Sequence, residues 1–498
     1  MLFNSFPFLL LFLPVIVAAW HFSTRLNRPW LPGVVLATGS VIFYAIWNPP
    51  LLLLLIGSIV VNYAIGAALG TTGRRGILLG AGIAANVVLL GVFKYAGFFA
   101  DTFSGLSGID WAVTGIALPL AISFFTFQQI AFLVDTYRGV VRENSLRRYF
   151  LFVSFFPQLI AGPIVRHDQV ASQLGRNLST GLTARNLAVG LTIIAFGLGK
   201  KVILADGIAG FVDPFYEEVA SGYDPQFIES WLIAVGYSFQ IYFDFSGYSD
   251  IAVGLATLFG IRLPVNFMNP YRSTNLIGFW RNWHITLSSF LRDYVYIPLG
   301  GNRRSLPRWY VNMFVVMLIG GLWHGAAWTF VVWGGLHGVG LSATHFLRKS
   351  GFGMAVPWII GWLTTFVFVT VLWVFFRADS FDTAGRILGA MAGIGGAFGT
   401  LSPSGILNDL DQMKFFGEWI VLVVGLAGFF ALIFPDTYQI MGRNYGLNPD
   451  GRSAKFAKWK INWRASMKYG VAVSALLVIG LAQLLLRVDS NQFIYFEF

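Results

Sequence analysis

The sequence contains no cysteine and few charged residues. Without cysteine, disulfide bonds, thiolate metal sites and a covalent thioester on a protein thiol are all excluded. Only 11% of the 498 residues are charged and 56% are hydrophobic, whereas a soluble domain carries about 25% charged residues. No Lys or Arg precedes the first apolar run, so this run is expected to be a membrane span and not a cleavable signal peptide. The composition indicates a protein that crosses the membrane many times.

The apolar segments are close to the roughly 20 residues that a membrane-spanning helix needs. They lie near residues 6–22, 31–47, 50–70, 77–99, 112–134, 356–376, 418–434 and 470–486. Residues 148–345 are apolar as well, but prolines, glycines and charges interrupt them. Broken helices of this kind are tolerated in a membrane where protein or a water-filled cavity surrounds them. We therefore expect an all-α polytopic fold with its functional residues in 148–345.

The net charge of +11 comes from basic residues in short loops between the apolar runs. This distribution is typical of the positive-inside bias of membrane proteins, so no nucleic-acid partner is expected. Basic residues follow the first, third and fifth spans: Arg25, Arg28, Arg74, Arg75, Arg138, Arg142, Arg147 and Arg148. They predict an extracytoplasmic N-terminus. By the same rule the basic segment 435–468 is expected in the cytoplasm and the acidic segment 378–417 outside.

Residues 242–250 place carboxylates and hydroxyls within an aromatic run, and Asp244 and Tyr248 are its central polar side chains. Ionisable side chains in apolar sequence are costly and suggest a functional site. The same groups can also hold neighbouring helices together by hydrogen bonds. A reactive role and a structural role both remain open.

A second polar group lies at residues 279–293. On a helix of about 100° per residue, four of its side chains fall within an arc of roughly 80°: Arg281, His284, Ser288 and Arg292. The pattern predicts one amphipathic helix with a cationic stripe. Such a helix can simply lie on the cytoplasmic leaflet with its arginines against lipid phosphate. A histidine between two arginines favours a functional role.

The third group centres on His324, which small residues flank in the apolar stretch 309–346. Small residues permit close helix packing and leave space beside the imidazole. A neutral imidazole suits a general base, although a core histidine bonded to a backbone carbonyl would show the same pattern.

The other histidines serve for comparison. His21 also follows a tryptophan, so the Trp-His dipeptide alone is uninformative. On a continuous helix His337 would lie about 140° from His324, and no metal-ligand spacing or phosphate loop is present.

Taken together, these motifs resemble the membrane-bound O-acyltransferase family, in particular the branch that acetylates alginate and other exported polymers. The resemblance rests on residues 269–272, 279–284, 292–294 and 321–325, with further matching stretches at 1–5, 123–128, 156–163, 244–250 and 493–496. It extends over nearly the whole chain. It implies a single membrane-embedded acyltransferase domain over 1–498, with about 11–13 transmembrane and re-entrant helices around a central tunnel. The catalytic centre would lie in 240–345, with peripheral spans in 1–135 and 356–498.

The resemblance also implies the roles of particular residues. His324 would be the main catalytic residue and His284 the second functional one, with Arg281, Asn282, Ser288, Trp323, Asp244 and Tyr248 in supporting or substrate-binding positions. No permanently bound cofactor or metal is expected. Acetyl-CoA or another acyl thioester would be the donor on the cytoplasmic side of the bacterial inner membrane. The acetyl group would pass to an extracytoplasmic SGNH-type acetyltransferase partner and then to a polysaccharide.

Two alternatives remain. D-alanyl transfer to teichoic acid is a related reaction, and members of that branch look similar around both histidines. A transporter or flippase of a lipid-linked saccharide would also suit broken helices and buried charges. The acceptor polymer and the carrier of the thioester are not encoded in any motif.

Overall fold

The helices of this computed structural model begin close to where the apolar segments predict them. The structure describes residues 3–47, 49–70, 73–111, 113, 117–160, 162–351, 356–394, 419–442, 461, 463–486 and 494, leaving aside the side chains of 175–177. All regular elements among these residues are helical. Most of the segments 378–417 and 435–468, for which we predict opposite sides of the membrane, lies outside the described residues, namely 395–417, 443–460 and 462.

Six helical segments are long and apolar enough to cross a membrane: 49–69, 75–107, 184–220, 306–324, 358–377 and 467–486. Shorter apolar helices cover 7–23, 31–45 and 419–432. The chain is therefore a multi-pass, all-α membrane protein. The span predicted at 112–134 is wrong in its first half, because the helix begins only at Ile122.

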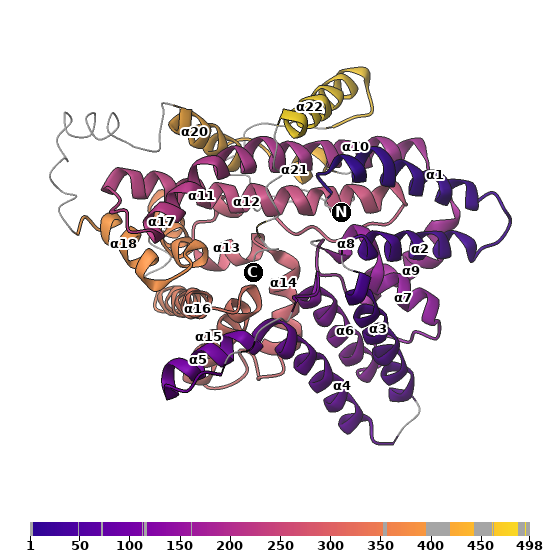
Figure 1. Cartoon of the computed structure of the whole chain (residues 1–498), viewed down its shortest axis with the longest axis horizontal. Coiled ribbons are helices and arrows are strands. Elements are labelled where there is room, and N and C mark those ends of the chain that lie inside the picture. Colours follow the sequence, from indigo (N-terminus) through magenta and orange to yellow (C-terminus); the bar gives the residue numbers. More distant parts are fainter. Residues whose placement is uncertain are drawn as a thin grey trace. The chain divides into compact units, whose positions relative to one another are not determined.

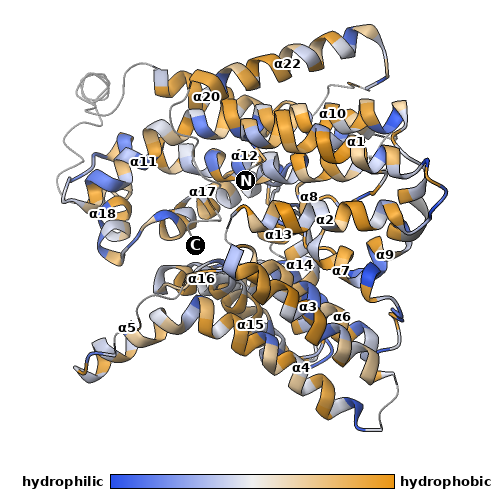
Figure 2. Cartoon of the chain, turned by 45° about the vertical axis from the view of Figure 1, so that its right-hand side comes forward, coloured by the Kyte–Doolittle hydropathy of each residue, from blue (hydrophilic) through white to orange (hydrophobic). Residues whose placement is uncertain are grey.

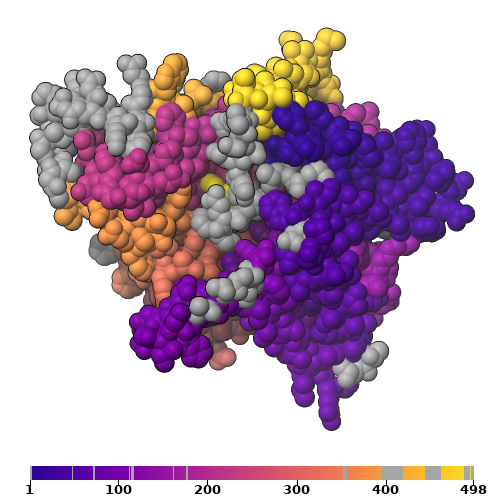
Figure 3. Space-filling model, viewed as in Figure 1, coloured from indigo at the N-terminus to yellow at the C-terminus, as the bar shows by residue number. Residues whose placement is uncertain are grey.

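The first compact unit comprises 1–198, 248–265 and 470–497. Its helices are α1 (Leu13–Ser23), α2 (Leu31–Ala45), α3 (Pro49–Leu69), α4 (Arg75–Leu90), α5 (Ala96–Ser107), α6 (Ile122–Tyr137), α7 (Leu146–Ser154), α8 (Phe156–Leu159), α9 (His167–Arg176), α10 (Ala184–Leu198) and α22 (Met467–Leu486). Within it α3, α4 and α6 pack together (Figure 1). Figure 2 shows long hydrophobic stretches along α3, α4 and α22, and Figure 3 shows α4 and α5 at the surface. Such exposed apolar helices are suited to contact with lipid.

The second unit comprises 199–247 and 266–469. It contains α11 (Asp206–Ala220), most of the long helix α12 (Phe227–Leu258), α13 (Leu276–Asn282), α14 (Ile285–Leu291), α15 (Leu306–His324), α16 (Trp328–Lys349), α17 (Trp358–Arg377), α18 (Phe381–Met391), α20 (Trp419–Leu432) and α21 (Thr437–Met441). All three polar groups singled out in the sequence have residues in this unit. The helices α15 and α16 form a hairpin of closely packed partners (Figure 1).

A buried carboxylate, Glu143, organises the start of α7 in the first unit. Its Oε1 accepts hydrogen bonds from the Arg148 guanidinium (2.8 Å) and the Ser145 backbone N–H (2.8 Å), while Oε2 lies 3.2 Å from Nε2 of His167. Burial acts to raise the pKa of this carboxyl. The hydrogen bonds from His167, Arg148 and Ser145 outweigh burial and hold the pKa below its usual range.

Because the folded pKa of Glu143 is depressed, the ionised carboxylate stabilises the fold above its unfolded pKa, and this contribution disappears as pH falls through the folded value. We expect Glu143→Gln to lower the unfolding free energy at pH 7 by about 1–3 kcal/mol. The difference in unfolding free energy between the variant and the wild type should disappear in acid. Thermal unfolding in detergent at several pH values would measure it. Arg147→Gln, which removes a neighbouring exposed charge, is the control. A difference in unfolding free energy that stays constant with pH would contradict the stabilising role of the ionised Glu143 carboxylate.

Candidate active site

Close packing of α15 on α16 sets the position of His324. A methyl group at Gly321 of α15 would collide with the Phe330 carbonyl oxygen, and one at Gly334 of α16 with the Met317 carbonyl. Only glycine therefore permits this backbone approach. The prediction that small residues around His324 allow close helix packing is confirmed.

His324 is the last residue of α15 and is buried. Aromatic rings surround its imidazole: Trp323 at 5.0 Å, Trp333 at 5.2 Å and Phe376 at 5.2 Å between ring centroids. The helix stops here, since 325–327 separate α15 from α16. The continuous helix that we assumed in order to separate His324 from His337 is thus wrong. Both imidazoles pack on Trp333, with His337 at 4.8 Å.

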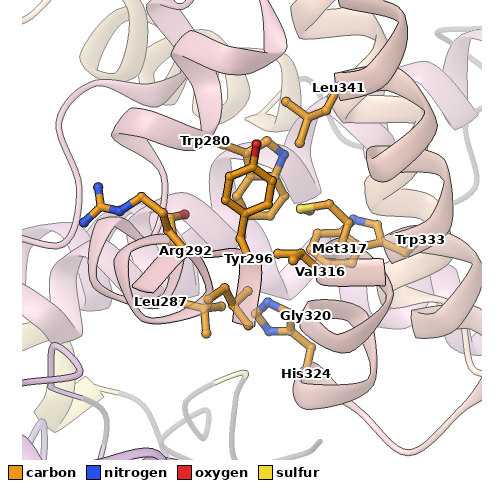
Figure 4. A pocket seen from close by; sticks show the side chains of 12 residues that line it. Trp280, Leu287, Arg292, Tyr296, Val316, Met317, Gly320, His324, Trp333 and Leu341 are labelled. Atoms are coloured by element: carbon orange, nitrogen blue, oxygen red, sulfur yellow. The ribbon is translucent and has the colours of Figure 1, made fainter. Parts of the chain in front are cut away.

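His324 also lines a cavity of about 150 Å³ (Figure 4). The other lining residues are mostly apolar: Trp280, Leu287, Ser288, Leu291, Arg292, Tyr296, Val316, Met317, Gly320, Trp333 and Leu341. They come from α13, α14, the π-helical turn Arg292–Tyr296, α15 and α16. Of the residues predicted for the site, His324 and Ser288 share this cavity.

The single amphipathic helix predicted over 279–293 is wrong. The chain breaks between α13 and α14, where Trp283 is extended and His284 adopts a left-handed conformation with φ +41° and ψ +56°. This conformation is uncommon for a residue with a side chain and concentrates at functional sites. The break separates His284 from the arginine stripe, because Arg281 is exposed whereas His284 is fully buried.

The break brings His284 close to His324. Their ring centroids are 6.3 Å apart, and Trp323 and Phe245 pack edge-on against His284 at 5.7 and 4.7 Å. His284 lies outside the six long apolar helical segments. Burial lowers the pKa of its imidazole to about 3. Burial therefore favours the neutral imidazole of His284 at physiological pH.

Asn266 holds the segment that contains His284. Its side-chain Oδ1 lies 3.1 Å from Nδ1 of His284 and accepts hydrogen bonds from the Thr286 backbone N–H (3.2 Å) and hydroxyl (2.9 Å). Its backbone carbonyl accepts from the Ile285 N–H at 2.9 Å. Sequence reasoning missed Asn266, and no local pattern distinguishes it from other asparagines such as Asn269.

The remaining predicted residues lie elsewhere. Arg281 and Asn282 are not among the residues that line the cavity, and the Asn282 amide donates to Ser273 Oγ at 3.5 Å. Trp323 is buried between the two histidines, whose rings lie 5.7 and 5.0 Å from its own. Tyr248 belongs to the first unit, where it stacks on Phe3 at 4.9 Å.

Asp244 belongs to a buried ion-pair cluster with Lys201 and Asp206. The Lys201 ammonium lies 2.5 Å from Asp244 Oδ1 and 2.8 Å from Asp206 Oδ1, and all three side chains are at most 4% exposed. Buried charges need such partners, because desolvation of an unpaired ion is costly. The cluster joins the start of α11 to α12, which supports the structural reading of Asp244.

The known proteins that this chain resembles are acyltransferases. Residues 141–379, which include both histidines, match the sequence profile of the membrane-bound O-acyltransferase family. A peptidoglycan O-acetyltransferase of Helicobacter pylori is 44% identical, covering 80% of each chain. A protein named "Probable alginate O-acetylase AlgI" from Pseudomonas aeruginosa is 39% identical over 87% of this chain and 82% of its own. A teichoic acid D-alanyltransferase of Bacillus subtilis is 29% identical over 46% of this chain and 60% of its own. The chain belongs to the membrane-bound O-acyltransferase family and is an O-acyltransferase.

Proposed function

We propose that this enzyme transfers an acetyl group from a cytoplasmic thioester towards a hydroxyl group of an exported polysaccharide. The observation that carries the proposal is the pair of buried imidazoles 6.3 Å apart, of which His324 lines a small apolar cavity. Relatives named for O-acetylation of peptidoglycan and alginate, at 44% and 39% identity, support the polysaccharide as acceptor. Family membership favours this reaction over a transporter.

His324 is the general base in this proposal. A hydroxyl is a poor nucleophile at neutral pH, and its proton passes to His324 as its oxygen attacks the thioester carbon. The carbon–sulfur bond then breaks, and His324 returns the proton to the leaving thiolate. The negative end of the α15 dipole lies at His324 and would stabilise the positive charge that the imidazole acquires. The acyl group cannot rest on a protein thiol, because the chain has no cysteine.

The cavity supports a short acyl group. A volume of about 150 Å³ lined by apolar side chains is enough for a molecule the size of benzene. An acetyl group fits this space. A D-alanyl group would bring an ammonium charge, yet none of the described residues that line the cavity has a carboxylate to pair with it. These features favour acetyl over D-alanyl transfer.

The proposal includes a direction across the membrane. The donor, acetyl-CoA or an acyl carrier protein, is anionic and would be attracted by the basic cytoplasmic loops. The N-terminus would be outside the bacterial inner membrane, and an extracytoplasmic SGNH-type partner would complete the transfer to the polymer.

Thioester turnover by the purified protein tests the proposal. Protein in liposomes is given acetyl-CoA with and without polysaccharide fragments of the alginate or peptidoglycan type, and with and without the partner. We expect release of free CoA to depend on the acceptor and acetyl ester to appear on it in equal amount. Movement of saccharide across the liposome without thioester consumption would contradict acyl transfer. Equal use of D-alanyl and acetyl thioesters would contradict the acyl preference.

A further inference from the structure

The hydrogen bonds of Asn266 define which nitrogen of His284 carries the proton. A backbone N–H can only donate, so the Asn266 atom that accepts from the Thr286 N–H must be the carbonyl oxygen Oδ1. The same oxygen lies 3.1 Å from Nδ1 of His284. A carbonyl oxygen carries no hydrogen and cannot donate. Therefore Nδ1 of His284 carries the hydrogen and donates it to Asn266 Oδ1. In a neutral imidazole the other nitrogen, Nε2, then has a free lone pair.

Two polar atoms at this place are buried without a hydrogen-bond partner among the described residues. They are Nε2 of His284 and the amide nitrogen Nδ2 of Asn266. Both side chains are at most 1% exposed. Buried polar groups are paired in the great majority of cases, so the unpartnered Nε2 of His284, on a ring whose centroid is 6.3 Å from that of His324, is available to a substrate group. Nε2 accepts a hydrogen bond, which fits an O–H or an N–H group of a substrate.

We propose that Asn266 is a positioning residue that holds His284 in the Nδ1-protonated tautomer, so that Nε2 accepts a hydrogen bond from a substrate O–H or N–H. The inference rests on the proposed acyl transfer. In this tautomer His284 acts as a hydrogen-bond acceptor towards the substrate, because its Nε2 has no hydrogen to give. The proton of the attacking hydroxyl still passes to His324, while His284 holds a second donor group nearby.

The backbone around His284 shows why a single side chain can set this tautomer. Residues 266–268 run beside 282–285, with the Met268 N–H donating to the Asn282 carbonyl at 3.0 Å and the Ile285 N–H to the Asn266 carbonyl at 2.9 Å. These bonds hold His284 in its left-handed conformation, which is strained without such support. While this arrangement persists, Nδ1 of His284 stays against the accepting oxygen of Asn266.

Nitrogen NMR of the full-length protein in lipid gives a test that is independent of catalysis. Protonated and unprotonated imidazole nitrogens have well-separated shifts, and the chain has six histidines, so subtraction of the His284→Gln spectrum identifies the signals of interest. We expect Nε2 of His284 to be unprotonated in the wild type. Asn266→Leu should lose the preference for one tautomer. Thr286→Val removes another donor to the same oxygen and should leave the tautomer unchanged.

Kinetics of the same variants identify the substrate that Nε2 binds. Loss of one hydrogen bond in Asn266→Leu should raise one KM about 10-fold and leave the other unchanged. A higher KM for the polysaccharide indicates a sugar hydroxyl, and a higher KM for the thioester indicates an amide N–H of the donor. Asn266→Asp, which keeps the accepting oxygen, should restore the tautomer. If Asn266→Leu fails to fold, the tautomer of His284 can still be measured in Asn266→Asp.

A protonated Nε2 in the wild type, or the same tautomer in Asn266→Leu, would overturn the inference even if the protein transfers acetyl. A variant that lowers kcat with both KM values unchanged would also overturn it. If wild-type protein shows the expected tautomer but never consumes thioester, the proposed function fails and the substrate role of Nε2 fails with it, while the tautomer assignment stands.

Discussion

His324→Ala is expected to lower acyl transfer by about 10²–10⁴-fold, the usual contribution of a general base. His324 is buried, lies at the end of α15 and lines the cavity of about 150 Å³. No other histidine lines this cavity, so none of the described side chains there is placed to take the proton instead. The measurement is acetyl ester formed by purified protein at equal concentration, together with the amount of protein in the membrane.

His21→Gln provides a matched control for His324→Ala. Both histidines follow a tryptophan in the sequence, but His21 lies in the first unit, where its Nδ1 accepts from the Leu182 N–H at 3.1 Å. We expect this variant to retain most of its activity. Wild-type acetylation by His324→Ala, or equal losses in both variants, would remove His324 from the role of base.

Much of the fold could be predicted from the sequence because lipid imposes a strong pattern. A spanning helix must be apolar over most of its length, so the segments near 50–70, 356–376 and 470–486 coincide with α3, α17 and α22. The pattern was less informative where helices are short or buried in protein. The segment 112–134 is largely apolar, yet α6 begins only at Ile122.

The break at His284 illustrates what periodicity cannot detect. Residues 279–293 contain no proline or glycine, and their polar side chains fit a helical repeat. The helix is nevertheless interrupted, because hydrogen bonds to Asn266, eighteen residues earlier, hold His284 and Thr286 in place. Tertiary contacts therefore override the local preference. The helical-face argument for His284 was wrong, and the role that the family resemblance implies for this residue stays a prediction.

The position of Asp244 could be singled out but its partner could not. A carboxylate within an aromatic run has a desolvation cost, which a charged or polar partner must offset. Lys201, which offsets it, stands forty-three positions earlier beside another lysine, and nothing in the sequence separates Lys201 from Lys200. In the structure Lys201 is almost fully buried and Lys200 only half-buried. The pairing depends on how α11 and α12 pack, and a single sequence does not encode that visibly.

Lys201→Met is expected to destabilise the fold strongly. It leaves two carboxylates, Asp206 and Asp244, buried without the ammonium that lies 2.8 and 2.5 Å from them. Breaking a buried ion pair by removing one partner costs about 3–5 kcal/mol. The expected result is a large drop in the thermal unfolding midpoint in detergent and little protein in the membrane. Lys200→Met should have a clearly smaller effect.

The triple variant Lys201→Met, Asp206→Asn, Asp244→Asn separates the two readings of Asp244. It removes all three charges, and neutral replacement of a buried ion cluster is often tolerated, because no uncompensated charge remains. We expect it to recover at least half of the stability lost by Lys201→Met, as measured by the same unfolding midpoint. If the cluster only joins α11 to α12, the folded triple variant also keeps most of its acyl transfer. A triple variant that folds but is as inactive as His324→Ala would instead make Asp244 part of the chemistry. One that stays as unstable as Lys201→Met would show that the charges are not the cause of the loss.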